Sequence, residues 1–267
     1  MHFSRVAAIV LRQFYLIRAS SSRFLPLFIW VAVDIVLWGF LTRYLNTLNS
    51  ATFNFVPAML GAVLFWDFFI RIMQGVTMAF FEDVWARNFL NIFSTPISII
   101  EYITGLMLCT VATSAIGIIV MFVLAVMVFG LSFAGFGVFV IPFLIVLFMF
   151  GIALGVAASA LVLRLGPAAE WFIWPIPAII SPFVGVLYPV TILPKWMQIT
   201  SRLLPPSYVF ECLRDIVFGR EVSWIGLVWG AGIAVLYIFL ACAFFISTYK
   251  HALRTGLIAR YTAESLS

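Results

Sequence analysis

The fold is decided by the uncharged stretch Tyr102–Leu163, YITGLMLCTVATSAIGIIVMFVLAVMVFGLSFAGFGVFVIPFLIVLFMFGIALGVAASALVL, which contains no Asp, Glu, Lys or Arg. A helix needs about 20 mostly apolar residues to cross the hydrocarbon core of a bilayer. The stretch is long enough for two such helices. Gly130, Gly135 and Gly137 near its middle supply turn residues, so we predict two membrane spans joined by a short connection.

The composition of the whole chain agrees with a membrane environment. Of 267 residues, 65% are hydrophobic and only 9% are charged, and the mean hydropathy is +1.19. An ordinary globular protein is roughly one quarter charged. We therefore expect lipid to surround most of this chain, which excludes a soluble domain.

The same rule of length predicts six transmembrane helices in an all-α polytopic membrane protein, and residues 1–267 are expected to form a single transmembrane domain. The predicted spans are about 24–45, 54–80, 102–129, 137–163, 171–190 and 222–249. The fifth span holds several prolines, each of which removes a backbone donor that the membrane cannot replace. We expect that span to be kinked or broken.

The distribution of basic residues predicts the orientation, because Lys and Arg near span ends stay preferentially on the cytoplasmic side. One side carries Arg5, Arg12, Arg18, Arg23, Arg87, Arg164, Lys250, Arg254 and Arg260, and the other carries Arg43, Lys195, Arg202, Arg214 and Arg220. Both termini are thus expected in the cytoplasm, with the chain in the inner membrane. Topology and anionic membrane lipids explain the net charge of +5 better than nucleic acid does.

Residues 2–20 have the pattern of a helix that lies in the membrane interface. One side of the predicted helix carries Val6, Val10, Phe14 and Ile17. Arg5 and Arg12 lie roughly opposite. This pattern favours an interfacial helix, and a frayed basic tail is the alternative.

The connection 82–101 between the second and third spans is the longest on the cytoplasmic side. It opens with acidic residues and contains two possible helix starts. Thr95 can cap a helix with Pro96 in its first turn, or Ser98 and Glu101 can form a capping box. In either case the sequence predicts a structured hairpin to which a cytoplasmic partner could dock.

Two short amphipathic helices are expected between the fifth and sixth spans, at or partly within the outer leaflet. In the first, Trp196, Ile199 and Leu203 share a face. In the second, one side carries Val209, Cys212, Leu213, Ile216 and Val217, and Gly219 ends the helix.

Charged residues inside predicted spans tend to mark function, because an ion at bilayer depth costs at least about 2.5–3.5 kcal/mol. Asp34 lies in the first span, and Asp67 and Arg71 lie four residues apart in the second. They could form a structural ion pair that joins the two helices. Alternatively, they could act as a substrate site or gate, or as the coupling residues of an ion-driven secondary transporter.

Several chemistries are absent from the sequence. Neither of its lysines, Lys195 and Lys250, lies in a phosphate-binding loop motif. His2 and His251 lack the neighbours of a zinc site, and no serine lies in a G-x-S-x-G motif. We therefore assign this chain no catalytic residue, no metal and no cofactor, and a lipid-modifying membrane enzyme is disfavoured.

Two local patterns resemble the membrane subunit of ABC-2 type exporters. The first begins at Phe81-Glu82-Asp83 and continues through Arg87, Leu90, Ser94, Pro96 and Glu101 to Gly105. The second comprises Ser181-Pro182-Phe183-Val184-Gly185-Val186-Leu187-Tyr188-Pro189, Leu193-Pro194-Lys195-Trp196-Met197-Gln198, Leu204-Pro205-Pro206-Ser207-Tyr208 and Leu213-Arg214. The order of these patterns along the chain, together with the topology, carries the resemblance.

The resemblance implies a division of labour. A second permease subunit, most simply another copy, would complete the pathway for an amphipathic or hydrophobic cargo such as a lipid, glycan or drug. Two copies of a separate ABC ATPase would bind ATP and Mg. Contact with the ATPase would involve Arg5, Arg12, Glu82, Asp83, Arg87, Pro96 and Glu101. An outer gate region would include Pro182, Tyr188, Pro189 and Pro194.

Overall fold

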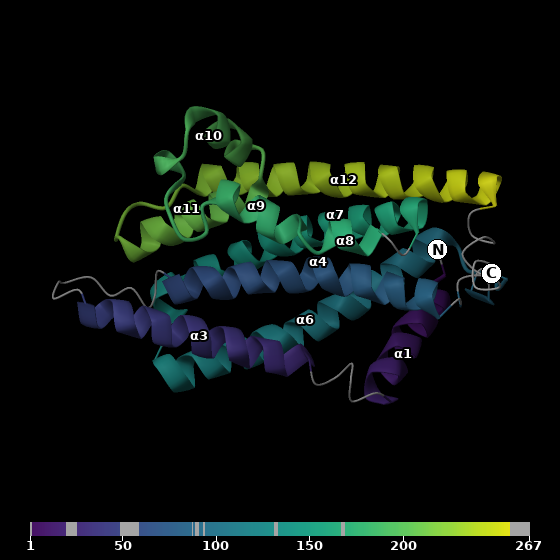
Figure 1. Ribbon diagram of the computed structural model, residues 1–267, viewed down its shortest axis with the longest axis horizontal. Coiled ribbons are helices and arrows are strands. Elements are labelled where there is room, and N and C mark those ends of the chain that lie inside the picture. Colours follow the sequence, from purple (N-terminus) through teal and green to yellow (C-terminus); the bar gives the residue numbers. More distant parts are fainter. Residues whose placement is uncertain are drawn as a thin grey trace.

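The computed structural model describes residues 2–19, 26–48, 59–86, 88, 91–92, 94–130, 133–166 and 169–256. These residues form helices joined by turns, with no strand among them (Figure 1). The helices are α1 (Phe3–Ala19), α3 (Pro26–Leu48), α4 (Gly61–Trp85), α6 (Ile99–Phe129), η2 (Phe133–Phe139), α7 (Val140–Leu165), α8 (Glu170–Ile173), α9 (Ile176–Val184), η4 (Val190–Ile192), α10 (Lys195–Arg202), α11 (Pro205–Val217) and α12 (Trp224–Thr255).

Four helical segments in the described part of the chain are long and apolar enough to cross a membrane. They are Gly61–Trp85, Ile99–Phe129, Phe136–Leu165 and Trp224–Thr255. The helix α3 has 23 residues and runs beside α4 and α6 (Figure 1). The predicted all-α, multi-pass architecture is therefore confirmed, whereas the count of six spans stays a prediction.

The fifth predicted span, 171–190, does not form one helix. Its residues form α8, of 4 residues, and α9, of 9 residues. Pro175 lies between the two helices, and α9 ends at Gly185, whose φ of 68° lies in the left-handed region that glycine adopts without strain. The predicted break is present, whereas the bounds of this span stay a prediction.

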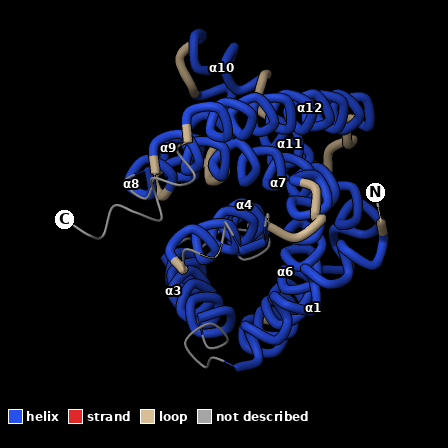
Figure 2. The backbone as a smooth tube through the Cα atoms, turned by 90° about the vertical axis from the view of Figure 1, so that its right-hand side faces the viewer, coloured by secondary structure: helices blue, strands red, loops and turns tan. Residues whose placement is uncertain are grey.

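The helix α4 forms the centre of the bundle. Figure 2 shows α4 between α7 on one side and α6 with α3 on the other, and Phe65, Phe69 and Phe80 on α4 are fully buried. The ring of Phe69 stacks on Phe150 of α7 at 5.6 Å between centroids. A Cβ atom at Gly155 of α7 would lie only 2.8 Å from the carbonyl oxygen of Met73, so this glycine permits close approach of the two helices.

The two ends of the bundle carry different elements (Figure 1). One end of the bundle contains α1, the end of α4, the start of α6 and the last turn of α12. The distal end contains η2, α10, α11 and the start of α12. The described parts of both chain ends thus lie at the same end of the bundle.

Candidate functional site

The helix α1 packs across α6 through one narrow face. Val6, Ile9 and Gln13 are buried, and a Cβ atom at Gly105 of α6 would lie only 2.6 Å from Cγ2 of Ile9. Phe14 is exposed. The apolar side predicted from the sequence, which carries Val6, Val10, Phe14 and Ile17, therefore differs from the side of α1 that packs on α6. The two sides share Val6.

A buried carboxylate fixes α1 to the last turns of α4. Arg12 donates from Nη1 to Oδ2 of Asp83 at 2.9 Å, and from Nη2 to Oδ1 of the same carboxylate. The hydroxyl of Tyr102 donates to Asp83 Oδ2 at 2.6 Å. Asp83 is 1% exposed and Tyr102 is fully buried. We call Arg12, Asp83 and Tyr102 the Asp83 cluster.

A second carboxylate fixes the start of α1 to the start of α6. Glu101 accepts a hydrogen bond from the backbone N–H of His2 at 2.7 Å and lies 3.5 Å from Nη1 of Arg5. The same side chain closes a capping box with Ser98, since each backbone N–H donates to the other's side chain. Ser98 is therefore the N-cap of α6, and the alternative start at Thr95 and Pro96 is wrong.

These contacts bridge the connection between α4 and α6. Asp83 precedes the connection and Glu101 follows it, and both carboxylates bind α1. The hydrogen bond to Asp83 raises the pKa of Arg12 above its ordinary value, so Arg12 remains charged at any physiological pH. The structure thus joins α1 and both ends of the connection into one unit.

The other residues expected to contact an ATPase lie on this connection or at the end of α4. Glu82 is partly exposed at the end of α4. Pro96 is exposed before α6 begins. Arg87 lies outside the described residues. Four of the expected residues, Arg5, Arg12, Asp83 and Glu101, are therefore brought together by direct contacts.

The three charges predicted inside spans lie near one another. Asp34 on α3, and Asp67 and Arg71 on α4, are each within electrostatic range of the other two. Gly117 of α6 lies beside Arg71, since a Cβ atom there would make an ordinary contact of 3.7 Å with the guanidinium. The Oδ2 atom of Asp67 is buried and accepts no hydrogen bond from the described residues.

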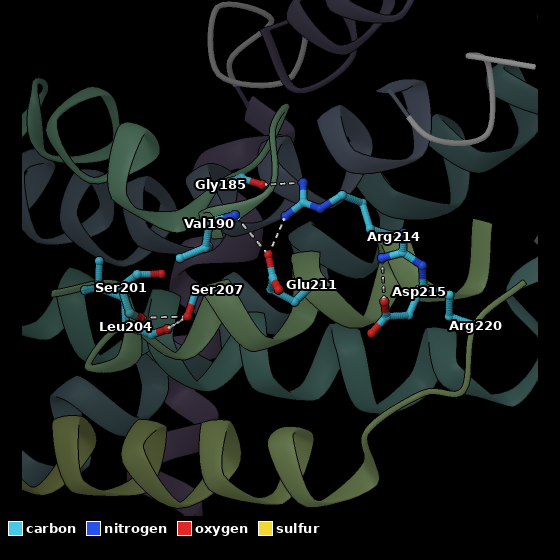
Figure 3. Close-up of polar contacts among 9 residues, drawn as sticks. All are labelled: Gly185, Val190, Ser201, Leu204, Ser207, Glu211, Arg214, Asp215 and Arg220. Carbon is cyan, nitrogen blue, oxygen red and sulfur yellow. Dashed lines mark hydrogen bonds and ion pairs between the residues drawn. The ribbon is translucent and has the colours of Figure 1, made fainter. Parts of the chain in front are cut away.

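A polar network holds the distal end together (Figure 3). Arg214 of α11 donates to the carbonyl oxygen of Gly185 at 2.7 Å and to Glu211 at 3.2 Å. Glu211 also accepts a hydrogen bond from the backbone N–H of Val190 at 3.0 Å. We call Gly185, Val190, Glu211 and Arg214 the distal network. It fixes the segment after α9 onto α11.

The predicted outer gate residues lie along the segment that carries Gly185 and Val190 of this network. Pro182 lies within α9, and its carbonyl oxygen accepts a hydrogen bond from the hydroxyl of Tyr188 at 2.9 Å. Pro189 precedes η4, and Pro194 is the N-cap of α10. They define the path of the chain from α9 to α10.

The described part of the chain offers no metal site, because no three His, Cys, Asp or Glu residues gather in it. The three cysteines are free thiols. Burial raises the pKa of Cys212, on α11, to about 11, so its thiol is protonated and unsuited to nucleophilic chemistry at neutral pH.

These features define a multi-pass helical membrane protein. The family model for ABC-2 family transporter proteins matches residues 24–249, which is most of the chain. The protein therefore belongs to the ABC-2 transporter family, as its motifs indicated. Membership identifies a membrane transport subunit of a type that normally works with an ABC ATPase partner.

A curated relative is nodulation protein J of Rhizobium meliloti (strain 1021). It is 31% identical to this chain over 93 residues, which cover 34% of each protein. The similarity thus spans about a third of the relative's length.

Sequence reasoning missed three polar side chains that the structure places in these clusters. Tyr102 was counted as an apolar residue of a span, although a buried tyrosine hydroxyl usually finds a hydrogen-bond partner. Glu211 was not singled out, and Arg214 entered only as one of the basic residues and as part of the pattern that resembles the family. Their signal was their spacing of three residues, which allows an ion pair on one helix face.

Proposed function

We propose that this chain is the translocating subunit of an ATP-driven exporter in the inner membrane. Two copies would form the pathway for an amphipathic or hydrophobic cargo, and two ABC ATPase subunits would bind ATP and Mg. The observation that carries the proposal is the bridge from α1 to Asp83 and Glu101. It gives an ATPase one continuous unit on which to act.

Membership of the family supports an ATPase partner, because ABC-2 permeases normally work with an ABC ATPase. The sequence supports an ATPase on another polypeptide, since this chain contains no phosphate-binding loop motif. In the proposed mechanism, ATP-driven closure of the ATPases pushes on the α4–α6 connection. The Asp83 cluster transmits that displacement to α4, which lies at the centre of the bundle.

The test uses the chain purified with its ATPase and reconstituted in proteoliposomes. Arg87→Ala and Pro96→Ala on the connection are compared with Arg220→Ala, an exposed arginine at the distal end. We expect both connection variants to uncouple ATP hydrolysis from transport and the control to remain coupled. Normal coupling in both connection variants, or an ATPase that does not copurify with the chain, would overturn the proposal.

The buried charges support one alternative, an ion-coupled transporter that uses Asp34, Asp67 and Arg71. Asp67 has a buried oxygen without a hydrogen-bond partner among the described residues, which is a suitable position for an exchanging proton. Transport driven by a proton gradient without ATP, and lost in Asp67→Asn, would favour this function. Transport that needs ATP and survives collapse of the gradient would exclude it.

A further inference from the structure

The helix α10 packs onto the protein in an orientation that is unusual for an amphipathic helix. Gln198 donates to the carbonyl oxygens of Leu193 at 2.8 Å and Thr191 at 3.2 Å. Ser201 is buried, and its carbonyl oxygen accepts a hydrogen bond from the hydroxyl of Ser207 at 2.7 Å. The contacts of α10 with the rest of the chain therefore include polar ones.

Two apolar residues of α10 and its C-cap residue are largely exposed, whereas Met197 is half-buried. Trp196, Ile199 and Leu203 are 62%, 64% and 59% exposed, and they recur at the spacing of one helix face. We call these three residues the outward face of α10. In water this arrangement would be unfavourable, because it buries polar groups and exposes apolar ones. Something apolar must cover the outward face.

The charges of α10 indicate the chemistry of that cover. The helix contains two basic residues, Lys195 and Arg202, and no acidic residue. Both basic residues are exposed. An amphipathic helix whose charged residues are basic is typical of binding to a surface of anionic lipid.

The position of α10 fits the headgroup layer. With 8 residues it is about 12 Å long, too short to cross a bilayer. It lies at the distal end, where α12 begins (Figure 1). Trp224 and Trp229 near the start of α12 are exposed, and exposed tryptophans gather at membrane interfaces. The neighbouring helix α11 is buried along the side that carries Val209, whereas α10 leaves its apolar side chains exposed at the same end as these tryptophans.

We propose that α10 binds the headgroup layer at the distal end of the bundle, with its outward face against acyl chains and its two basic residues on the phosphates of anionic phospholipids. Contact with lipid would also stabilise the distal network. The ring of Trp196 contacts Phe183 of α9 at 6.0 Å between centroids, and the segment between these helices is bonded to α11 through Glu211.

The test measures fluorescence quenching of Trp196 in the full chain. The chain has 9 tryptophans, so the difference between the natural chain and Trp196→Phe isolates its emission. Vesicles contain brominated phosphatidylcholine, with or without brominated phosphatidylglycerol. We expect loss of Trp196 emission with both lipids and a larger loss with phosphatidylglycerol. That excess should disappear in the double variant Lys195→Gln, Arg202→Gln.

A second variant, Trp196→Phe with Ile199→Trp, moves the fluorescent probe by one helical turn along the outward face. The tryptophan introduced there should be quenched by lipid in the same way. This variant tests whether the whole outward face contacts lipid, because its result does not depend on the local surroundings of Trp196.

Three results would overturn the proposal. Quenching by aqueous iodide instead of brominated lipid would place the outward face in water. Protection from both quenchers would mean that protein covers it, such as a second copy of this chain. Equal quenching by the two lipids would remove the anionic preference. All these outcomes are independent of ATP and of the proposed exporter function.

Discussion

Replacing Asp83 by asparagine should release α1 from the bundle. The change keeps the shape of the side chain but removes its charge. An amide also presents an N–H to Arg12 or Tyr102, both of which are donors in the Asp83 cluster. At least one hydrogen bond is therefore lost, and the guanidinium of Arg12 is left without its counter-charge.

The size of the effect follows from burial. Removing one partner of a buried ion pair costs about 3–5 kcal/mol. Asp83 is almost completely buried, but the side chain of Arg12 is 27% exposed, so water can partly solvate its charge. The lower value, about 3 kcal/mol, is the better expectation. It corresponds to an increase of roughly 100-fold in the equilibrium constant for opening of α1.

Hydrogen exchange of the α1 amides in detergent micelles measures this opening directly. Tyr102→Phe removes the charge-assisted hydrogen bond from α6 to Asp83, worth about 1.5 kcal/mol. It keeps both hydrogen bonds from Arg12, so it should increase exchange in α1 much less than Asp83→Asn does. Asp215→Asn is the matched control, because Asp215 pairs with Arg220 at 4.0 Å on the surface of the distal end and should leave α1 unchanged. If the α1 amides of folded Asp83→Asn exchange as slowly as those of the natural chain, the reasoning is refuted.

Three further predictions concern close contacts and burial. Gly105→Leu should also increase exchange in α1, because its side chain would overlap the helix; Gly232→Leu, where no atom lies within 4 Å, should not, and equal effects would contradict the packing. Arg214→Leu removes two hydrogen bonds of the distal network and should destabilise the segment 185–194 by about 2–3 kcal/mol, measured as faster amide exchange there; unchanged exchange would show that the network is not stabilising. Burial raises the pKa of Cys212 to about 11. In a variant whose other two cysteines are replaced by alanine, the Cys212 thiol should therefore react slowly with a maleimide at pH 7 and rapidly after unfolding in SDS. Fast reaction in the folded protein would contradict the burial of Cys212.

The helices that cross the membrane could be recognised from local sequence. A backbone in hydrocarbon must satisfy its hydrogen bonds within one segment, so length and apolar composition are sufficient to locate a span. Gly130 was expected to end a helix, and it does so with a left-handed conformation. The fifth span was harder, because proline predicts a break but not where the helix resumes or ends.

The start of α6 shows a limit of local reasoning. Thr95 with Pro96 and Ser98 with Glu101 are both chemically competent helix starts. The contact that accompanies the second one comes from His2, which lies 99 residues away in the chain. Local sequence could not rank the two starts, because the N-terminal helix contributes part of the stabilisation.

The sequence by itself determined the solvent, the helical class and the family of this protein, since apolar length and motif order are properties of contiguous residues. Only the tertiary structure decided which charges meet. A shift of one residue turns a helical side chain by about 100° around the axis, and the rotation of each helix depends on all its neighbours. Tyr102 therefore reads as an ordinary apolar-span residue in the sequence, whereas packing of α1, α4 and α6 makes it a partner of Asp83.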